Sequence, residues 1–223
     1  MQRPLQEELT DPRVLLVDGM ALLFRAFYAT SYSGYILKTS AGLPTNAVYG
    51  FVKYFWDAVE RFRPSHIVCC WDLGSKTFRS EKFEDYKANR PDCPEELIPQ
   101  FDLVKEVTQS FGVMNVGLPG YEADDCIGTL ARLYSEKADV YILTGDHDML
   151  QLVDERIHVV IMKKGQGNYA VYTPAALFEE KPADSAAVHR LEGADGRYGR
   201  QLPGRERHRR ENGDQAAGRV RLG

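Results

Sequence analysis

Apolar residues along this chain alternate between short unbroken runs and longer stretches with helical spacing. The short runs, rich in β-branched residues, cover residues 14–17, 67–71, 113–116 and 140–143. Runs of this length bounded by turn residues are typical of buried strands in a parallel sheet. The clearest helical spacing runs from Asn46, a candidate N-cap, to about Arg63. Further helices are expected at residues 21–28, 94–111, 123–134 and around 149–150, and an antiparallel extension at 157–162 and 169–172.

Strands and helices alternate in the order βαβαβαβ. This order predicts an α/β fold with a doubly wound, mainly parallel sheet. A chain of 223 residues is long enough to bury one sizeable core.

Acidic side chains follow all four short apolar runs. In open α/β sheets ligands bind outside the carboxyl ends of the strands, so we expect these side chains to converge. The candidates are the carboxylates of Asp18, Asp72, Glu122, Asp124, Asp125, Asp146 and Asp148. Such a cluster would repel itself unless divalent cations neutralised it, and hard oxygen ligands select Mg²⁺ or Mn²⁺. The chemistry that suits this site is two-metal phosphoryl transfer.

Any one of these acids has a simpler explanation. An Asp at a strand-to-helix junction is often an N-cap, and acids in a first helical turn complement the helix dipole. Two of the four sites carry more acids than capping needs. The group as a whole therefore favours a metal site.

Basic and aromatic residues are interleaved between the second strand and the next helix. The stretch from residue 74 to 94 contains Lys76, Phe78, Arg79, Lys82, Tyr86, Lys87 and Arg90. This mixture suits a single-stranded nucleic acid, with cations on phosphates and rings stacked on bases; a solvated helical face is the alternative. Arg25 stands in an apolar run, where a buried charge needs a partner such as a phosphate oxygen.

Composition argues against several other classes of protein. The chain has no apolar stretch long enough to span a bilayer and no signal-peptide pattern, so we expect a soluble, cytoplasmic protein. Its four cysteines lack Cys-x-x-Cys spacing, which predicts reduced thiols and no zinc site. The formal net charge of -4 does not exclude DNA, because bound cations would offset the clustered carboxylates.

Six motifs occur in order along residues 13–180. They are Leu16-Val17-Asp18-Gly19 with Phe24-Arg25, Thr45-Asn46-Ala47-Val48-Tyr49-Gly50-Phe51, Trp71-Asp72 with Phe78-Arg79, Tyr86-Lys87-Ala88-Asn89-Arg90, Tyr121-Glu122-Ala123-Asp124-Asp125 and Thr144-Gly145-Asp146-His147-Asp148. With these separations the chain resembles the 5′ to 3′ exonuclease domain of bacterial DNA polymerase I and its free-standing bacillary relatives, in the flap endonuclease superfamily.

The resemblance implies a PIN- or resolvase-like fold in which residues 74–94 form a helical arch over a 5′ strand. It implies a monomeric, structure-specific 5′ nuclease that acts on 5′ flaps, nicks, single-stranded 5′ ends and RNA-DNA primer junctions, with no membrane partner.

The resemblance also implies roles for individual residues. Asp18, Asp72, Glu122, Asp124 and Asp125 would hold or surround one Mg²⁺ or Mn²⁺ ion, and Asp146 and Asp148 would contribute to a second. Arg25 and Lys87 would stabilise charge developing on the scissile phosphate. Tyr28, Arg79, Tyr86 and Arg90 would bind the nucleic acid, with Tyr86 stacked on a base.

The composition changes after the catalytic domain, which we place at residues 1–182. Residues 183–223 contain nine Arg, no Lys and seven Gly, and lack the third acidic motif and helix-hairpin-helix that the resemblance leads us to expect. A one-base change of reading frame lets residues 196–217 encode both. We therefore expect a frameshift near residues 182–188, a disordered aberrant tail and strongly impaired nuclease activity. The alternative is an Arg/Gly-rich tail that binds nucleic acid.

Other functions remain in competition. A PIN-like ribonuclease uses a similar acidic crevice, and a DNA-binding remnant would hold a 5′ end without cleaving it. A haloacid-dehalogenase-type phosphatase needs an acid at the position that Met20 occupies. The single His147-Asp148 dipeptide is weak support for a His-Asp phosphohydrolase. A dinucleotide site is disfavoured because Gly-x-Gly-x-x-Gly does not follow the first strand.

Overall fold

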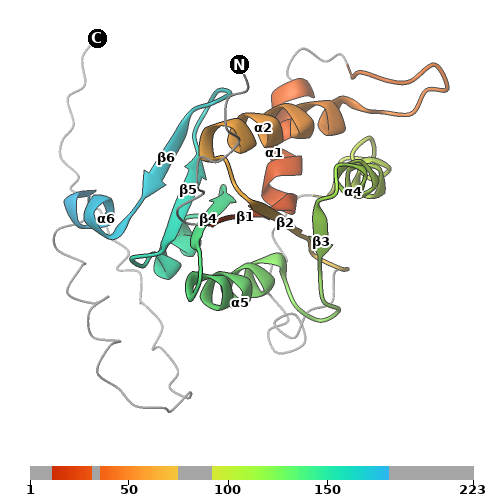
Figure 1. The fold of residues 1–223 in the computed structure, drawn as a ribbon. Coiled ribbons are helices and arrows are strands. Elements are labelled where there is room, and N and C mark those ends of the chain that lie inside the picture. The colour runs from red at the N-terminus through yellow and green to blue at the C-terminus, as the bar shows by residue number, and fades with distance from the viewer. Residues whose placement is uncertain (1–11, 32–35, 75–91, 181–223) are drawn as a thin grey trace, which may run out of the picture.

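The acid-ended apolar runs form parallel strands of one sheet. The computed structural model describes residues 12–31, 36–74 and 92–180 (Figure 1). In chain order its elements are β1 (Arg13–Asp18), α1 (Gly19–Ser31), α2 (Asn46–Phe62), β2 (His66–Cys70), α4 (Gln100–Ser110), β3 (Met114–Val116), α5 (Ala123–Ser135), β4 (Asp139–Thr144), the 3-10 helix η1 (His147–Leu152), β5 (Ile157–Met162), β6 (Tyr169–Tyr172) and α6 (Pro174–Glu180).

The six strands lie in the order β3-β2-β1-β4-β5-β6. All neighbours are parallel except β5 and β6, which form the predicted antiparallel pair. The chain moves outward from β1 to β3 and then returns to place β4 on the other side of β1. The predicted doubly wound, mainly parallel fold is confirmed, and the strand order reverses between β1 and β4.

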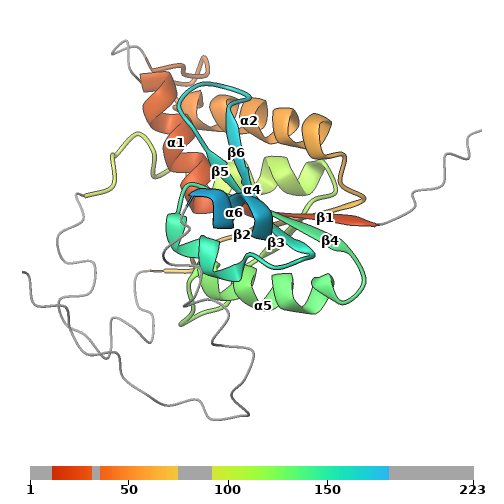
Figure 2. The same ribbon diagram turned by 90° about the vertical axis from the view of Figure 1, so that its left-hand side faces the viewer.

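Helices cover both faces of the sheet (Figures 1 and 2). Along β1, Leu15 and Val17 pack with α1, α2 and α4, whereas Val14 and Leu16 pack with α5 and η1. This burial on both sides explains why the strand is a continuous apolar run without polar alternation.

The turn from β1 into α1 is packed against an aromatic side chain. A Cβ atom at Gly19 would lie 2.6 Å from ring atoms of Trp71, so only glycine fits there without a shift of the ring. Trp71 is fully buried, stacks on Phe51 with ring centroids 5.9 Å apart, and donates from Nε1 to Asn115 Oδ1 at 2.7 Å. The residue before Asp72 is therefore firmly held.

Two helix starts differ from the sequence prediction. Helix α4 begins at Gln100, because residues 95–99 form turns. Asn46 is the first residue of α2, and the prediction that it is the N-cap is wrong, because Thr45 occupies that position. The buried amide of Asn46 instead donates to Thr30 Oγ1 at 3.0 Å and to Ser31 Oγ at 3.1 Å, tying α2 to the end of α1.

The N-terminus of α2 is satisfied from another helix. Gln100 Oε1 accepts hydrogen bonds from Ala47 N at 2.8 Å and Val48 N at 3.2 Å, and its Nε2 donates to Asn46 Oδ1 at 3.0 Å. Gln100 is fully buried. One amide side chain thus joins the starts of α2 and α4.

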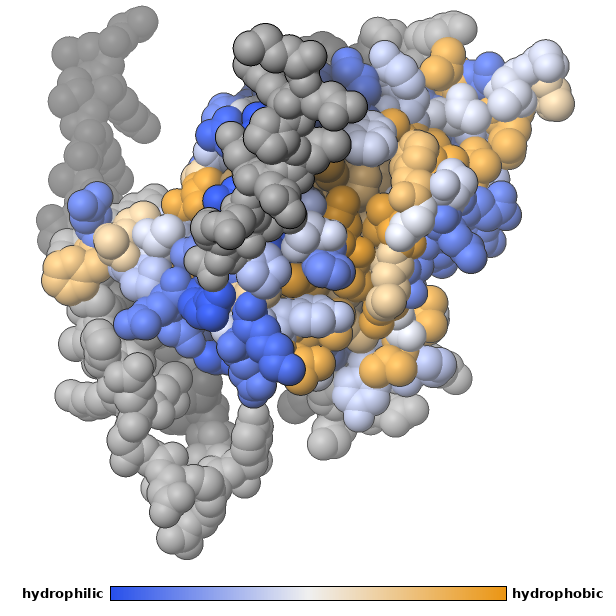
Figure 3. Space-filling model, in the orientation of Figure 1, coloured by the Kyte–Doolittle hydropathy of each residue, from blue (hydrophilic) through white to orange (hydrophobic). Residues whose placement is uncertain are grey.

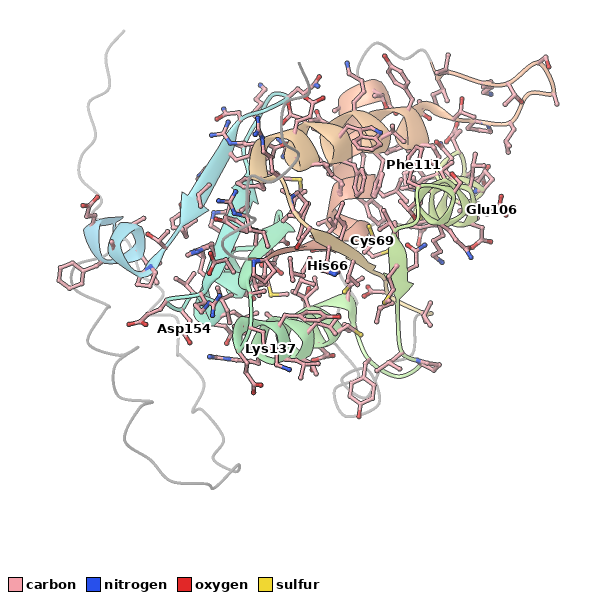
Figure 4. The ribbon with its side chains drawn as sticks, viewed as in Figure 1. His66, Cys69, Glu106, Phe111, Lys137 and Asp154 are labelled. Atoms are coloured by element: carbon pink, nitrogen blue, oxygen red, sulfur yellow. The ribbon has the colours of Figure 1, made fainter. Side chains whose placement is uncertain are left out.

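The β3 edge of the sheet exposes apolar side chains. Figure 3 shows apolar residues gathered along β3, beside hydrophilic residues of α4. Met114 is 60% exposed, and the ring of Phe111 lies 5.5 Å from that of Trp56 on α2. Figure 4 shows Phe111 on the side of α4 toward α2, with Glu106 pointing outward. The edge strand itself is only three residues long.

All four cysteines are free thiols in the structure, and three of them are buried.

In the part of the chain that the structure describes, we find no helix with the length and apolar character needed to cross a membrane.

Candidate active site

A pocket of about 430 Å³ lies at the carboxyl edge of the sheet. Five of the predicted acids line it, and they come from four places in the fold: Asp18 ends β1, Asp72 follows β2, Glu122 and Asp124 begin α5, and Asp146 follows β4. The structure thus brings these five side chains together. The pocket lies where the strand order reverses between β1 and β4, where α/β sheets bind ligands.

Asp18 is buried at the base of this arrangement. Its Oδ1 accepts a hydrogen bond from Ala21 N at 2.9 Å, and its Oδ2 accepts one from Thr144 Oγ1 at 2.8 Å. Because each oxygen has its own donor, the carboxylate has one defined orientation.

The segment after β4 continues this chain of hydrogen bonds. Asp146 N donates to Thr144 Oγ1 at 3.0 Å. Asp146 is also the N-cap of η1, because its Oδ1 accepts a hydrogen bond from Asp148 N at 2.8 Å. Asp146 lines the pocket, whereas Asp148 is exposed and is absent from the lining. Asp148 therefore contacts Asp146 through its backbone N–H but does not line the pocket with the other acids.

Helix α5 directs its N-terminus at the pocket. Asp72 Oδ1 accepts a hydrogen bond from Ala123 N at 2.6 Å, where the helix dipole favours a negative charge. Asp125 turns back along the helix, and its Oδ2 accepts from Glu122 N at 3.0 Å as part of a capping box. Asp125 therefore holds Glu122 in place and does not itself line the pocket.

Burial and mutual repulsion raise the pKa of two pocket acids. Desolvation is the largest cause for Asp124, whose pKa rises to about 6, and the charges of the other four lining acids add to it. Burial also raises the pKa of Asp18, against the hydrogen bonds from Ala21 and Thr144. Among the described residues, the pocket lining contains no Lys or Arg to offset these charges.

The donor set fits a hard divalent cation. All five lining acids offer carboxylate oxygens, which Mg²⁺ and Mn²⁺ prefer. Among residues 12–31, 36–74 and 92–180, no three His, Cys, Asp or Glu side chains are grouped tightly enough to hold an ion as they stand. The five acids therefore line an open pocket and do not form a closed ligand cluster.

Arg25 and Tyr28, both predicted to serve the substrate, lie on α1 outside the pocket lining. Arg25 Nη1 donates to Met162 O at 3.2 Å, and its guanidinium lies 5.6 Å from the centre of the Tyr54 ring. This partly buried charge thus has a carbonyl and an aromatic ring as partners. Tyr28 is 56% exposed beside the pocket residue Phe24, with ring centroids 6.5 Å apart.

The sequence interpretation missed two residues of the pocket region. Phe24 lines the pocket, and its position relative to Ala21 and Tyr28 is a helical spacing that could have shown their shared face. Thr144 was read only as part of a motif, although a polar residue ending an otherwise apolar strand is itself a signal.

The remaining predicted residues, Arg79, Tyr86, Lys87 and Arg90, lie outside the described residues, as do residues 75–91 of the expected arch and the tail from residue 183.

Comparison with known proteins supports the interpretation of the motifs. Residues 13–181 match the family described as 5′-3′ exonuclease, N-terminal resolvase-like domain. A Bacillus subtilis protein named 5′-3′ exonuclease is 55% identical over 172 residues, which are 77% of this chain and 58% of that protein. DNA polymerase I of Streptococcus pneumoniae is 39% identical over 193 residues, 86% of this chain and 22% of the polymerase. The chain thus spans little more than half of the first relative and less of the second.

Solved structures show the same fold. The bacteriophage T5 5′-exonuclease with bound zinc gives a TM-score of 0.56 at 18% identity, covering 77% of this chain and 62% of the phage protein. The T5 flap endonuclease in a complex with DNA and metal ions gives 0.58 at 20% identity, covering 77% and 61%. The match to the family model over residues 13–181, which is most of the chain, shows that the protein belongs to the family of 5′-3′ exonuclease N-terminal resolvase-like domains.

Proposed function

We propose that this domain is a metal-dependent nuclease that hydrolyses phosphodiesters of DNA at or near a 5′ end. The observation that carries the proposal is the pocket at the reversal of strand order, into which four segments of the chain bring five carboxylates. The relative from Bacillus subtilis is named for this activity, and the T5 flap endonuclease was crystallised with DNA and metal ions.

Asp18, Asp72, Glu122, Asp124 and Asp146 would hold the cations, Mg²⁺ or Mn²⁺, with Asp125 and Asp148 supporting from outside the lining. Held by these residues, divalent cations would supply electrostatic stabilisation of the negative charge that develops on a phosphodiester during hydrolysis. The protein contributes orientation: backbone N–H groups of Ala21 and Ala123 and the hydroxyl of Thr144 fix the two acids that end β1 and follow β2. Asp124 must lose its proton to serve as a ligand, and a cation beside it would favour that loss.

The substrate side of the proposal rests on α1. Phe24 in the pocket wall and the exposed Tyr28 offer rings on which the bases of a single strand could stack. Arg25 and Lys87 would stabilise the charge of the scissile phosphate, and Arg79, Tyr86 and Arg90 would hold the strand. In this role Arg25 exchanges Met162 O for a phosphate oxygen. The proposed substrates are 5′ flaps, nicks, single-stranded 5′ ends and RNA-DNA primer junctions.

We further propose that the catalytic domain ends near residue 182 and that residues 183–223 are read in a shifted frame. The end of the family match at residue 181 supports this boundary. With the third acidic motif absent from the tail, the chain would cleave poorly. We propose a monomeric, cytoplasmic protein.

The test measures Mg²⁺- or Mn²⁺-dependent cleavage of a 5′-flap DNA by this chain and by a version with the frame restored after Lys181, each beside its Asp72→Asn variant. Cleavage by the restored protein alone supports both the activity and the frame change. Cleavage by both supports the activity and contradicts the impairment. Cleavage by neither, with the restored protein folded, overturns the nuclease assignment.

A single-stranded RNA is included as a second substrate. Faster cleavage of this RNA than of flap DNA would favour the PIN-like ribonuclease. Tight DNA binding without metal-dependent cleavage by either protein would identify a non-catalytic remnant.

A further inference from the structure

Thr144 joins two of the pocket acids that come from opposite halves of the sheet. It ends β4, directly beside β1, and is fully buried. Its Oγ1 is 2.8 Å from Asp18 Oδ2 and 3.0 Å from Asp146 N. We propose that Thr144 is a positioning residue that sets the orientation of Asp18 and the distance between Asp18 and Asp146. This inference rests on the proposed metal-dependent function of the pocket.

The direction of each hydrogen bond follows from its donors. A backbone N–H can only donate, so Asp146 N occupies a lone pair of the Thr144 oxygen, and the single hydroxyl proton is left for Asp18 Oδ2. Ala21 N donates to the other oxygen of Asp18 at 2.9 Å. Both oxygens of Asp18 are thus fixed by donors, and each keeps a further lone pair for a cation.

Burial makes this hydroxyl hard to replace. The side chain of Thr144 has no exposed surface, so if the hydroxyl were lost, bulk water could not take its place beside Asp18. Valine has the same shape and high strand propensity, and the neighbouring residues Ile142 and Leu143 are apolar. Strand formation and packing therefore do not require the hydroxyl, whereas the hydrogen bonds to Asp18 and Asp146 require it.

Loss of the hydroxyl should act on cation binding more than on folding. Without it, Asp18 Oδ2 loses its donor and Asp146 N loses its acceptor, so the two carboxylates are free to move relative to each other. Mutation of groups that hydrogen-bond to metal ligands, and so orient them, usually lowers metal affinity or activity by about 10- to 100-fold. We expect a weakening of that size for Mn²⁺.

The experiment measures free Mn²⁺ by electron paramagnetic resonance during titration of the full 223-residue chain, and thermal unfolding without metal. The variants are Thr144→Val, which removes only the hydroxyl function, and Thr144→Ser, which keeps it. Thr108→Val is the matched control, because Thr108 is also buried and its hydroxyl bonds to Lys105 O and Asn115 Oδ1, neither of which belongs to a pocket acid.

We expect Thr144→Val to weaken Mn²⁺ binding by about 10- to 100-fold. Thr144→Ser should stay close to the wild type, and Thr108→Val should lower the unfolding temperature without changing Mn²⁺ affinity. If Thr144→Val does not fold, Thr144→Ala against Thr144→Ser makes the same comparison.

Three outcomes overturn the inference. Equal Mn²⁺ affinity of the wild type and Thr144→Val refutes the role of Thr144 while leaving the proposed function intact. An equal loss in Thr144→Ser and Thr144→Val shows that packing, not the hydroxyl, matters. If the wild type binds no more Mn²⁺ than Asp18→Asn, the metal site itself fails, and this inference with it.

Discussion

At the amino-terminal edge of the sheet, carboxylates face arginines. Asp139, the first residue of β4, contacts Arg156 Nε at 3.2 Å, and Asp154 before β5 contacts Arg132 Nη1 at 3.0 Å. Figure 4 labels this edge at His66, Lys137 and Asp154, which stand at or before the starts of β2, β4 and β5.

At the opposite edge of the same strands, five carboxylates share one pocket, and its lining includes no Lys or Arg among the described residues. Their repulsion adds to burial in raising the pKa of Asp124 to about 6. Asp139 and Asp154 have arginine neighbours, whereas Asp18, Asp72 and Asp146 in the pocket accept hydrogen bonds from backbone N–H groups and one hydroxyl. The difference between the edges therefore indicates where an external cation is needed.

The largest expected effect is on catalysis. Asp72→Asn keeps the shape of the side chain but removes a charge from the pocket. Cleavage of a 5′-flap DNA by an active form of the protein should therefore fall by more than about 100-fold. This loss exceeds the one typical of residues that only hydrogen-bond to metal ligands. The control at the other edge is Asp154→Asn, which should leave the rate unchanged. Equal losses in both variants would show that the two edges do not differ in function. Initial rates at saturating Mg²⁺ measure the effect.

Crowding of the carboxyl edge should show in stability. In Gly19→Ala the new Cβ would lie 2.6 Å from ring atoms of Trp71, and this overpacking should lower the free energy of unfolding by about 1–3 kcal/mol. In Gly128→Ala on α5, the new Cβ would meet Leu152 at 3.8 Å, an ordinary contact, so we expect stabilisation by about 0.5–1 kcal/mol. Urea unfolding measures both. A neutral Gly19→Ala would mean that Trp71 moves freely.

Asp124 should destabilise the metal-free protein at neutral pH. The pKa of Asp124 is about 6 in the folded protein and near its ordinary value of 3.8 in the unfolded chain. Between these two pH values the folded state therefore binds more protons than the unfolded state. Stability from this group is therefore present at low pH and lost as the pH rises through 6. Without metal, Asp124→Asn should be more stable than the wild type by about 1 kcal/mol at pH 8, allowing for solvent screening, and the difference should shrink toward pH 4.

The matching measurement adds Mn²⁺ at pH 8. The wild type should then gain more stability than Asp124→Asn, because the lost carboxylate also binds the cation. A variant less stable than the wild type without metal would contradict the repulsion within the pocket.

The smallest effect belongs to the amino-terminal edge. The side chains of Arg132 and Asp154 are each at least half exposed, so Arg132→Ala should change the free energy of unfolding by no more than about 1 kcal/mol. A clearly larger loss would show that the arginine contacts are essential to the fold. Thermal unfolding at low and high salt separates the two cases.

Local patterns were sufficient to predict the strands and the convergence of the acids. Each strand is a short apolar run, and each acid follows its strand closely, so parallel pairing alone brings Asp18, Asp72 and Asp146 to one edge. The antiparallel β5–β6 pair could be predicted for the same reason, because each of its strands is also a short, mostly apolar run.

Contacts between distant segments could not be predicted in this way. Gln100 caps α2 across 53 residues, and no local pattern distinguishes it from an exposed Gln. Likewise, the sequence shows Thr144 as a polar residue at the end of an apolar strand, but only the structure shows that its hydroxyl bonds to Asp18. Asp124 and Asp125 are adjacent and chemically identical, yet one faces the pocket and the other caps its own helix, because successive helical residues point about 100° apart.

The reversal of strand order has a consequence for how the protein is made. The hydrogen bond between Thr144 and Asp18 joins residues 126 positions apart, and pairing of β1 with β4 is needed to form it. Such contacts of high contact order form slowly, because a long loop must close before they give any stabilisation. The ribosome synthesises β1, β2 and β3 before β4, so this contact forms only after all four strands have been made. A nascent domain that lacks β4 carries its first acids without a complete cation site.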